Sequence, residues 1–143
     1  MIEIRRAAGS GELQAALALR EQVFCAEQGV SEAGDRDGRD HEAVQLVAVE
    51  DAGVVVGTCR VLVENGDAKF GRLAVRHDRR GHGVGARLLA HAEREAADLG
   101  ARRMGLAAQT HAMGIYERAG FAAYGATFDD EGIPHRAMEK SLA

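Results

Sequence analysis

A glycine-rich turn between a strand pattern and a long helix pattern is the feature that most constrains this chain. The segments follow one another as strand, basic turn, glycine turn and helix: Gly71–Val75, Arg76–Arg80, Gly81–Gly85 and a helix that continues to Leu99. A helix start presents unpaired N–H groups and the positive end of the helix dipole. Glycine lets an anion approach that backbone because no Cβ stands in the way. The pattern therefore predicts an anion site, to which Arg79 and Arg80 add positive charge; the alternative is a flexible loop with surface arginines.

Two common phosphate-binding patterns fit this turn poorly. Gly81, Gly83 and Ala86 match the dinucleotide pattern G-x-G-x-x-A. A dinucleotide-binding turn opens straight after the first strand, however, and an acid follows near the end of the next strand. Here a basic segment intervenes, and Gln109 and Thr110 occupy that strand end. No Gly-Lys-Ser/Thr follows the glycines, so the Walker pattern also fails.

The order of strand and helix patterns predicts a mixed sheet with helices on its faces, in a single domain over 1–143. Apolar residues make up 46% of the chain, which is enough to bury a core. Strands are expected over 2–4, 44–50, 54–63, 68–75, 103–108, 121–128 and 136–142. Helices are expected over 10–27, with Ser10 as N-cap, and over 83–99 and 112–119. Loops are expected over 29–40 and 129–135.

Composition excludes several functions. The net charge of −4 argues against a nucleic-acid partner, which needs clustered positive charge. No apolar run approaches membrane-spanning length and no leader is visible, so we expect no membrane partner and a cytoplasmic location. Cys25 and Cys59 lack metal-ligand spacing, so no metal is expected. The acidic segments Glu32–Glu42 and Asp129–Glu131 either attract a cationic amine or are solvated loops.

Two motifs, one at the glycine turn and one after the next strand, resemble those of the GNAT superfamily of N-acetyltransferases. Arg80, Gly83 and Gly85 match its Arg/Gln-x-x-Gly-x-Gly/Ala motif, and Tyr116–Phe121 matches its Tyr-x-x-x-Gly-Phe motif. Four further segments resemble the ElaA-like branch of that superfamily: Leu19–Phe24, Glu27–Ser31, Asp37–Asp40 and Gly132–His135. Gln45 stands where the branch pattern has a histidine. The resemblance implies an α/β (α+β) GNAT fold: a mixed, mostly antiparallel sheet of six to seven strands, helices on both faces, and splayed central parallel strands.

The resemblance also implies an acetyl-CoA-dependent N-acyltransferase, with acetyl-CoA as co-substrate. Its backbone contacts to the pantetheine arm would come from Leu73, Ala74 and Val75. The pyrophosphate would lie on the turn made by Arg80, Gly81, His82, Gly83, Val84 and Gly85, and Gln109 and Ala112 would border the arm. A primary amine on a small molecule or a peptide would attack the thioester directly, and homodimers are common in such families.

Acid and base roles are less defined. The resemblance makes Tyr116 the candidate general acid, because a phenol keeps its proton at neutral pH; the alternative is a packed helix tyrosine. The fourth strand carries no carboxylate to serve as base. The candidate bases are Glu27, His41, Glu131 and His135, all in loops expected to border the acceptor pocket, and His135 is the best of them because Pro134 stiffens its position.

Two other functions remain open from the sequence. The Arg20–Phe24 stretch loosely resembles acyl-homoserine-lactone synthases, although those enzymes are longer and richer in aromatic residues. A non-catalytic acyl-CoA-binding regulatory module would share the glycine turn but would not depend on Tyr116.

Overall fold

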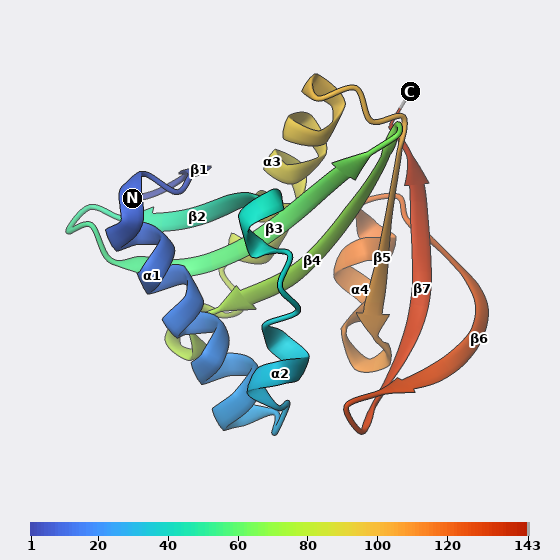
Figure 1. The fold of residues 1–143 in the computed structure, drawn as a ribbon, viewed down its shortest axis with the longest axis horizontal. Helices are drawn as coiled ribbons and strands as arrows, with labels where there is room; N and C mark the ends of the chain where they lie inside the picture. Colours follow the sequence, from blue (N-terminus) through green and yellow to red (C-terminus); the bar gives the residue numbers. More distant parts are fainter. Residues whose placement is uncertain (143) are drawn as a thin grey trace.

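The computed structural model describes residues 1–142 and contains a seven-stranded sheet in the order β1-β2-β3-β4-β5-β7-β6 (Figure 1). The strands are β1 Ile2–Arg6, β2 Val44–Glu50, β3 Val55–Glu64, β4 Asp67–Val75, β5 Arg103–Gln109, β6 Ala122–Asp130 and β7 Ile133–Ser141. All neighbouring pairs are antiparallel except β4 and β5. The predicted mixed, mostly antiparallel GNAT sheet is therefore confirmed.

The parallel strands β4 and β5 pair only at their beginnings. The pairs run from Asp67 opposite Arg103 to Lys69 opposite Gly105, and beyond them the two strands separate. On its other side β4 carries a bulge, because Arg72 and Leu73 fall between the residues paired with β3. Arg72 has φ of +56°, a conformation that residues other than glycine rarely adopt. The sheet therefore opens at its centre next to a strained residue.

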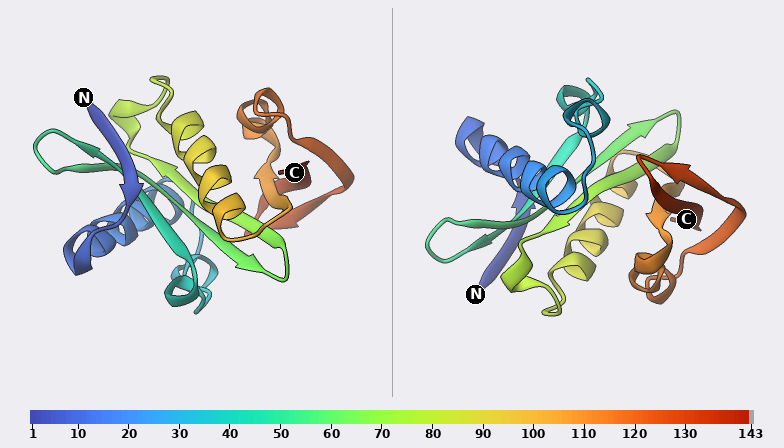
Figure 2. Two further views of the ribbon diagram at one scale, coloured as in Figure 1. Left: turned by 90° about the horizontal axis from the view of Figure 1, so that it is seen from above. Right: turned by 90° about the horizontal axis from the view of Figure 1, so that it is seen from below.

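The helices lie on both faces of the sheet, as predicted (Figure 2). Their bounds are α1 Gly9–Arg20, α2 Glu32–Asp35, α3 Val84–Asp98 and α4 Met113–Arg118. Figure 2 shows α1, in blue, and α3, in gold, on opposite faces. No helix in residues 1–142 is long and apolar enough to cross a membrane.

The buried stripe of α3 holds the central core in place. Val84, Leu88, Leu89, Ala92 and Ala96 are at most 2% exposed. Leu99, where the helix was expected to end, lies one residue beyond the last helical residue and is 49% exposed. Packing of this stripe against the sheet fixes where the helix begins, and so fixes the glycine turn.

The N-terminal helix departs from its prediction. It begins at Gly9 with Ala8 as N-cap, so the expectation that Ser10 caps it is wrong. The carboxylate of Glu12 accepts a hydrogen bond of 2.8 Å from the Ala8 N–H instead. The helix continues beyond Arg20 as the π-helix Glu21–Glu27, whose end agrees with the predicted one.

Both predicted loops contain regular structure. The expected loop over 29–40 contains α2, which is capped by Ser31 through a 2.9 Å hydrogen bond from the Gly34 N–H. The expected loop over 129–135 is a turn centred on Glu131 and Gly132, because both flanking strands extend into it. His135 is therefore a strand residue, paired across the sheet with Gln109.

Candidate active site

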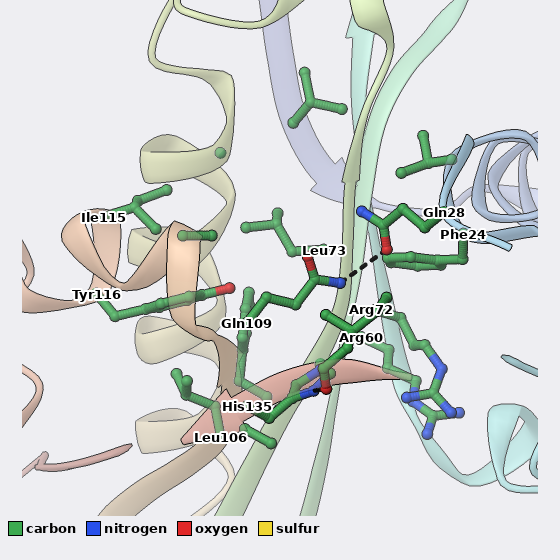
Figure 3. Close-up of a pocket in the computed structure, with 18 of the residues that line it drawn as sticks. Phe24, Gln28, Arg60, Arg72, Leu73, Leu106, Gln109, Ile115, Tyr116 and His135 are labelled. Atoms are coloured by element: carbon green, nitrogen blue, oxygen red, sulfur yellow. Dashed lines mark hydrogen bonds between the residues drawn. The ribbon is translucent and has the colours of Figure 1, made fainter. Parts of the chain in front are cut away.

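A cavity of about 790 Å³ lies where β4 and β5 separate. Its walls come from both strands, the start of α3, α4, the end of the π-helix and the β6–β7 hairpin (Figure 3). Twelve of the residues proposed from the sequence line it: Leu73, Val75, Arg80, Gly81, Gly83, Val84, Gly85, Gln109, Ala112, Tyr116, Glu131 and His135. Ala74, His82, Glu27 and His41 are not among its lining residues.

The glycine turn opens into this cavity. Gly81 and Gly83 have φ of +80° and +79°, so a side chain at either position would strain the turn. Gly83 is the N-cap of α3, and no side chain caps the helix, which leaves the first N–H groups of α3 without an intrahelical partner. A Cβ at Gly85 would lie 3.1 Å from Ile115 Cδ1 and 3.7 Å from Leu73 Cδ2. No atom lies within 4 Å of the Cβ position of Gly81 or Gly83, so the turn itself has room for a group that approaches its backbone closely.

The arginines beside the turn are held by acids. Arg80 donates through Nε to the Val75 carbonyl at 3.0 Å and forms an ion pair of 2.9 Å with Glu27. Glu27 was expected to border the acceptor pocket, and the structure places it at the glycine turn instead. Arg79 forms ion pairs with Glu50 and Asp78, so its charge is largely compensated.

Tyr116 packs in the core with its ring and reaches the cavity with its hydroxyl group. Its ring packs edge-on against Phe70 and Phe121, with centroids 6.1 and 6.2 Å away. The hydroxyl group points into the cavity toward Leu73 and Gln109 in Figure 3. Burial, and to a smaller extent Cys59, raises the pKa of Tyr116 to about 12. The phenol is therefore a proton donor, not a phenolate, at any physiological pH.

His135 has a defined tautomer when neutral. Its Nδ1 lies 2.7 Å from the Ile133 carbonyl oxygen. A carbonyl can only accept, so Nδ1 carries the hydrogen and Nε2 keeps a lone pair. The ring stacks on Phe128 at a centroid distance of 5.9 Å and is 9% exposed. The arrangement leaves an oriented proton acceptor at the cavity wall.

Hydrogen bonds beside the cavity join two pairs of segments that lie far apart in the sequence. Gln109 Nε2 donates to Gln28 Oε1 at 2.8 Å, which joins the end of β5 to the end of the π-helix (Figure 3). Glu131 Oε1 accepts from the Ser31 N–H at 2.8 Å and from its hydroxyl at 2.6 Å. These bonds lower the pKa of Glu131, so its carboxylate is ionised. The hairpin and the segment before α2 therefore enclose one end of the cavity.

Charged side chains between α1 and the sheet form a network, which we call the arginine–aspartate network: Arg20, Arg60, Arg72, Asp35, Asp37 and Asp40. Arg20 is fully buried and forms ion pairs with Asp35 at 3.2 Å and Asp40 at 2.6 Å. The Arg20 guanidinium is therefore neutralised inside the protein and not in solvent. Arg60 binds Asp37 through two nitrogens, and these hydrogen bonds hold the pKa of Asp37 well below its usual range. Asp35, Asp37 and Asp40 of the acidic segment Glu32–Glu42 are thus paired within the protein.

Several residues that line the cavity were not predicted from the sequence. Phe24, Gln28, Arg60, Arg72 and Ile115 all line the cavity. No spacing pattern connects them, because the fold brings them from the π-helix, β3, β4 and α4. His41, expected at the acceptor pocket, is an exposed residue of the short helix Asp40–Glu42. Within residues 1–142, no group of three or more side chains is placed to hold a metal ion.

Comparisons with known proteins agree with this geometry. Residues 12–142 match the family model described as an acetyltransferase (GNAT) domain. YjcF of Bacillus subtilis, an uncharacterized N-acetyltransferase, is 35% identical over 90% of this chain and 92% of its own. The crystal structure of Escherichia coli ElaA has a TM-score of 0.87 at 25% identity, covering 98% of this chain and 99% of that one. An acyl-CoA N-acyltransferase from Pseudomonas aeruginosa has a TM-score of 0.84 at 28% identity over the same shares.

A sheet that splays beside a glycine-capped helix, and a family model that matches nearly the whole chain, lead to one conclusion. The chain belongs to the GNAT acetyltransferase family, in its ElaA-like branch.

Proposed function

We propose that this chain is a single-domain N-acyltransferase that moves an acetyl group from acetyl-CoA to a primary amine by direct attack. One observation carries the proposal: the uncapped start of α3, the splayed strands and the Tyr116 hydroxyl all border one cavity. The cavity thus joins an anion cradle to a proton donor across an opening in the sheet. This is the arrangement that a thioester with a long phosphate-bearing arm requires.

The chain's own groups would bind the co-substrate along this cavity. The N–H groups of the glycine turn and of the first turn of α3 would hold the diphosphate, helped by the helix dipole. β4 pairs with β5 only from Asp67 to Lys69, so backbone groups of the stretch from Leu73 to Val75 that face β5 would be available to the pantetheine arm and the thioester carbonyl. Leu73 and Ile115 supply apolar walls.

Acetyl-CoA supplies a thioester that an amine can attack. His135 Nε2 would accept the proton that the amine loses as its nitrogen forms the new bond to the acyl carbon. A backbone N–H between Leu73 and Val75 would stabilise the charge that develops on the carbonyl oxygen. As the carbon–sulfur bond breaks, the Tyr116 hydroxyl would donate its proton to the departing thiolate. No covalent attachment to the protein is needed.

Thiol release from acetyl-CoA against a panel of primary amines tests the activity directly. We expect turnover with at least one class of amine, and a rise in the melting temperature at saturating acetyl-CoA, because a ligand that binds only the folded state stabilises it. The absence of both effects would refute the proposal. A thermal shift without turnover on any amine would instead favour the non-catalytic binding module.

Substitution of Gly85 by leucine tests where the co-substrate binds. The backbone at Gly85 is helical, so leucine fits the helix, but its side chain would fill the space beside Ile115 and Leu73. We expect the Kd for CoA, measured by isothermal titration calorimetry, to rise by more than about tenfold, the equivalent of ~1.4 kcal/mol. Gly11→Leu is the matched control, because Gly11 lies in α1 with no atom near its Cβ position. Equal affinity in the two variants would contradict the placement.

The pH dependence of kcat tests the proton assignments. Because burial raises the pKa of Tyr116 to about 12, the acid keeps its proton, and we expect no alkaline fall in kcat up to about pH 10. His135→Gln removes the proposed base, so at neutral pH its kcat should drop by about a hundredfold. The rate of this variant should then climb with pH as free amine accumulates. An alkaline fall below pH 9 in the wild type, or a His135→Gln variant of normal activity, would exclude the respective role.

A further inference from the structure

The acceptor end of the cavity has a cationic wall on β4. Lys69 pairs with Leu62 of β3, so the two side chains lie on the same face of the sheet. Arg60 lies two residues before Leu62 on β3, and alternation along the strand puts its side chain on that face as well. Arg72 reaches that face as well, because its guanidinium contacts the α2 segment. Figure 3 shows Arg60 and Arg72 on the side of the cavity opposite Tyr116. All three cations line the cavity.

Arg60 is the one member of this wall whose charge is fully matched. Its guanidinium forms hydrogen bonds to both carboxylate oxygens of Asp37 and to Asp40 Oδ1. Its side chain is only 6% exposed, so it is a structural cation held behind the wall.

Arg72 is anchored by backbone carbonyls, not by close carboxylates. Its Nε donates to the Asp35 carbonyl at 3.1 Å, and its Nη2 donates to the Gly34 carbonyl at 3.2 Å. The nearest carboxylate oxygens are 3.4 Å away on Asp35 and 3.5 Å away on Asp37, and both acids are already engaged by other arginines. Within residues 1–142, no hydrogen bond reaches Arg72 Nη1. The guanidinium is therefore oriented but has capacity for another anion.

Lys69 is the most available cation of the wall. Among the described residues, no hydrogen bond acceptor and no carboxylate within 4 Å engages its ammonium group, and the side chain is exposed. Glu139 lies on the same row, across Gly105, but two strand spacings separate it from Lys69, about 10 Å, and it contacts Arg103 instead. A lysine and a half-satisfied arginine three residues apart on one wall form a site for a carboxylate.

The β6–β7 hairpin brings negative charge to the cavity. Asp130 and Glu131 line the cavity, and the ionised Glu131 carboxylate lies against Gly34 of α2. A ligand with one negative and one positive group would therefore place its anion at Lys69 and Arg72 and its amine toward the hairpin carboxylates and His135. Arg72 also keeps the strained φ of +56°, and such strain is concentrated at binding and catalytic sites.

We propose that the acceptor is an amine that also bears a carboxylate, as in an amino acid or a short peptide, and that Lys69 and Arg72 bind this carboxylate. The inference rests on the proposed function and gives it a substrate class. Lys69 and Arg72 then set specificity through binding of the acceptor, while the acetyl transfer itself remains with the groups near the bulge.

Matched pairs of amines test the proposal. L-Lysine is compared with 1,5-diaminopentane, L-phenylalanine with 2-phenylethylamine, and glycylglycine with its C-terminal amide; the third pair separates peptides from free amino acids. We expect the carboxylate-bearing member of at least one pair to have kcat/KM about tenfold higher or more. Thermal shifts of the CoA-loaded protein measure binding of each amine independently of turnover.

Lys69→Met keeps the side-chain length and removes the charge. We expect Lys69→Met to raise KM for the preferred carboxylate-bearing amine about tenfold and to leave its kcat almost unchanged. The KM and kcat for the matched amine without a carboxylate should also stay almost unchanged. Lys69→Arg should bring KM for the carboxylate-bearing amine most of the way back to the wild-type value. Arg94 is an exposed cation on α3, so Arg94→Gln is the control and should change neither KM nor kcat for either amine. No carboxylate preference in turnover or in binding, or a preference that Lys69→Met leaves intact, overturns the inference. Thiol release with the decarboxylated amines would then still support the acyltransferase, whereas loss of the acetyl-CoA thermal shift would refute the proposed function itself.

Discussion

Tyr116→Phe is expected to lower kcat by about a hundredfold while the affinity for CoA stays the same. The substitution removes only the hydroxyl group, so the edge-on contacts of the ring with Phe70 and Phe121 remain. A lost general acid costs a rate factor of about 10² to 10⁴, and bulk water can replace part of its action here because the hydroxyl faces a cavity. Initial rates of thiol release at saturating amine measure the effect.

The other tyrosine of the chain is the control for this experiment. Tyr124 lies on β6, is 50% exposed and does not line the cavity, so Tyr124→Phe should leave kcat unchanged. The acetyl-CoA thermal shift should be the same in both variants. Unchanged turnover in Tyr116→Phe would show that the tyrosine only packs the core, and another donor would then have to be sought.

Arg20→Met should lower the free energy of unfolding by about 3 to 5 kcal/mol, which is a large part of the stability of a domain of this size. Arg20 is 0% exposed and bonds both Asp35 and Asp40, so its removal leaves buried carboxylate charge without its main partner. Asp35 Oδ2 already has no hydrogen-bond partner within residues 1–142, and this limits any rearrangement. Urea denaturation followed by circular dichroism gives the value.

An exposed ion pair provides the comparison for Arg20. Arg6 binds Glu95 at 2.8 Å, but its side chain is 56% exposed, so Arg6→Met should cost less than about 1 kcal/mol. The double variant Arg20→Met/Asp35→Leu should be more stable than Arg20→Met alone, because it removes the stranded charge as well. A loss below about 1 kcal/mol for Arg20→Met would mean that the network contributes no net stability.

The sequence allowed the fold and the glycine turn to be predicted because both depend on local patterns. The apolar stripe of α3 and the glycines at its start lie within one short stretch, so helix periodicity and backbone conformation were sufficient. The succession of strands along the chain could also be predicted, from apolar runs and the turn residues between them. Cap details were less accessible: Glu12 took over the role expected of Ser10, since a carboxylate one turn along can reach the same backbone.

The acceptor side could not be predicted, because it depends on long-range contacts. Arg72 lines the cavity because of a bulge in β4, and no residue pattern in the sequence predicts this bulge. Glu27 was expected to be an acceptor-pocket acid, but it pairs with Arg80, 53 positions away in the sequence, and only the folded chain brings the two together. His135 was expected on a loop; the extension of β7 by pairing with β5 placed it in a strand, with its ring fixed by the Ile133 carbonyl.

The arginine–aspartate network has a consequence for how this enzyme can evolve. It fastens residues 35–40 to the sheet and to α1 at Asp35, Asp37 and Asp40, while Arg39, which lies between two of these anchors, lines the cavity. A substitution at Arg39 can therefore reshape the pocket without removing an anchor. Such changes would alter which ligand fits the pocket, while the residues around Tyr116, on the other side of the cavity, stay the same.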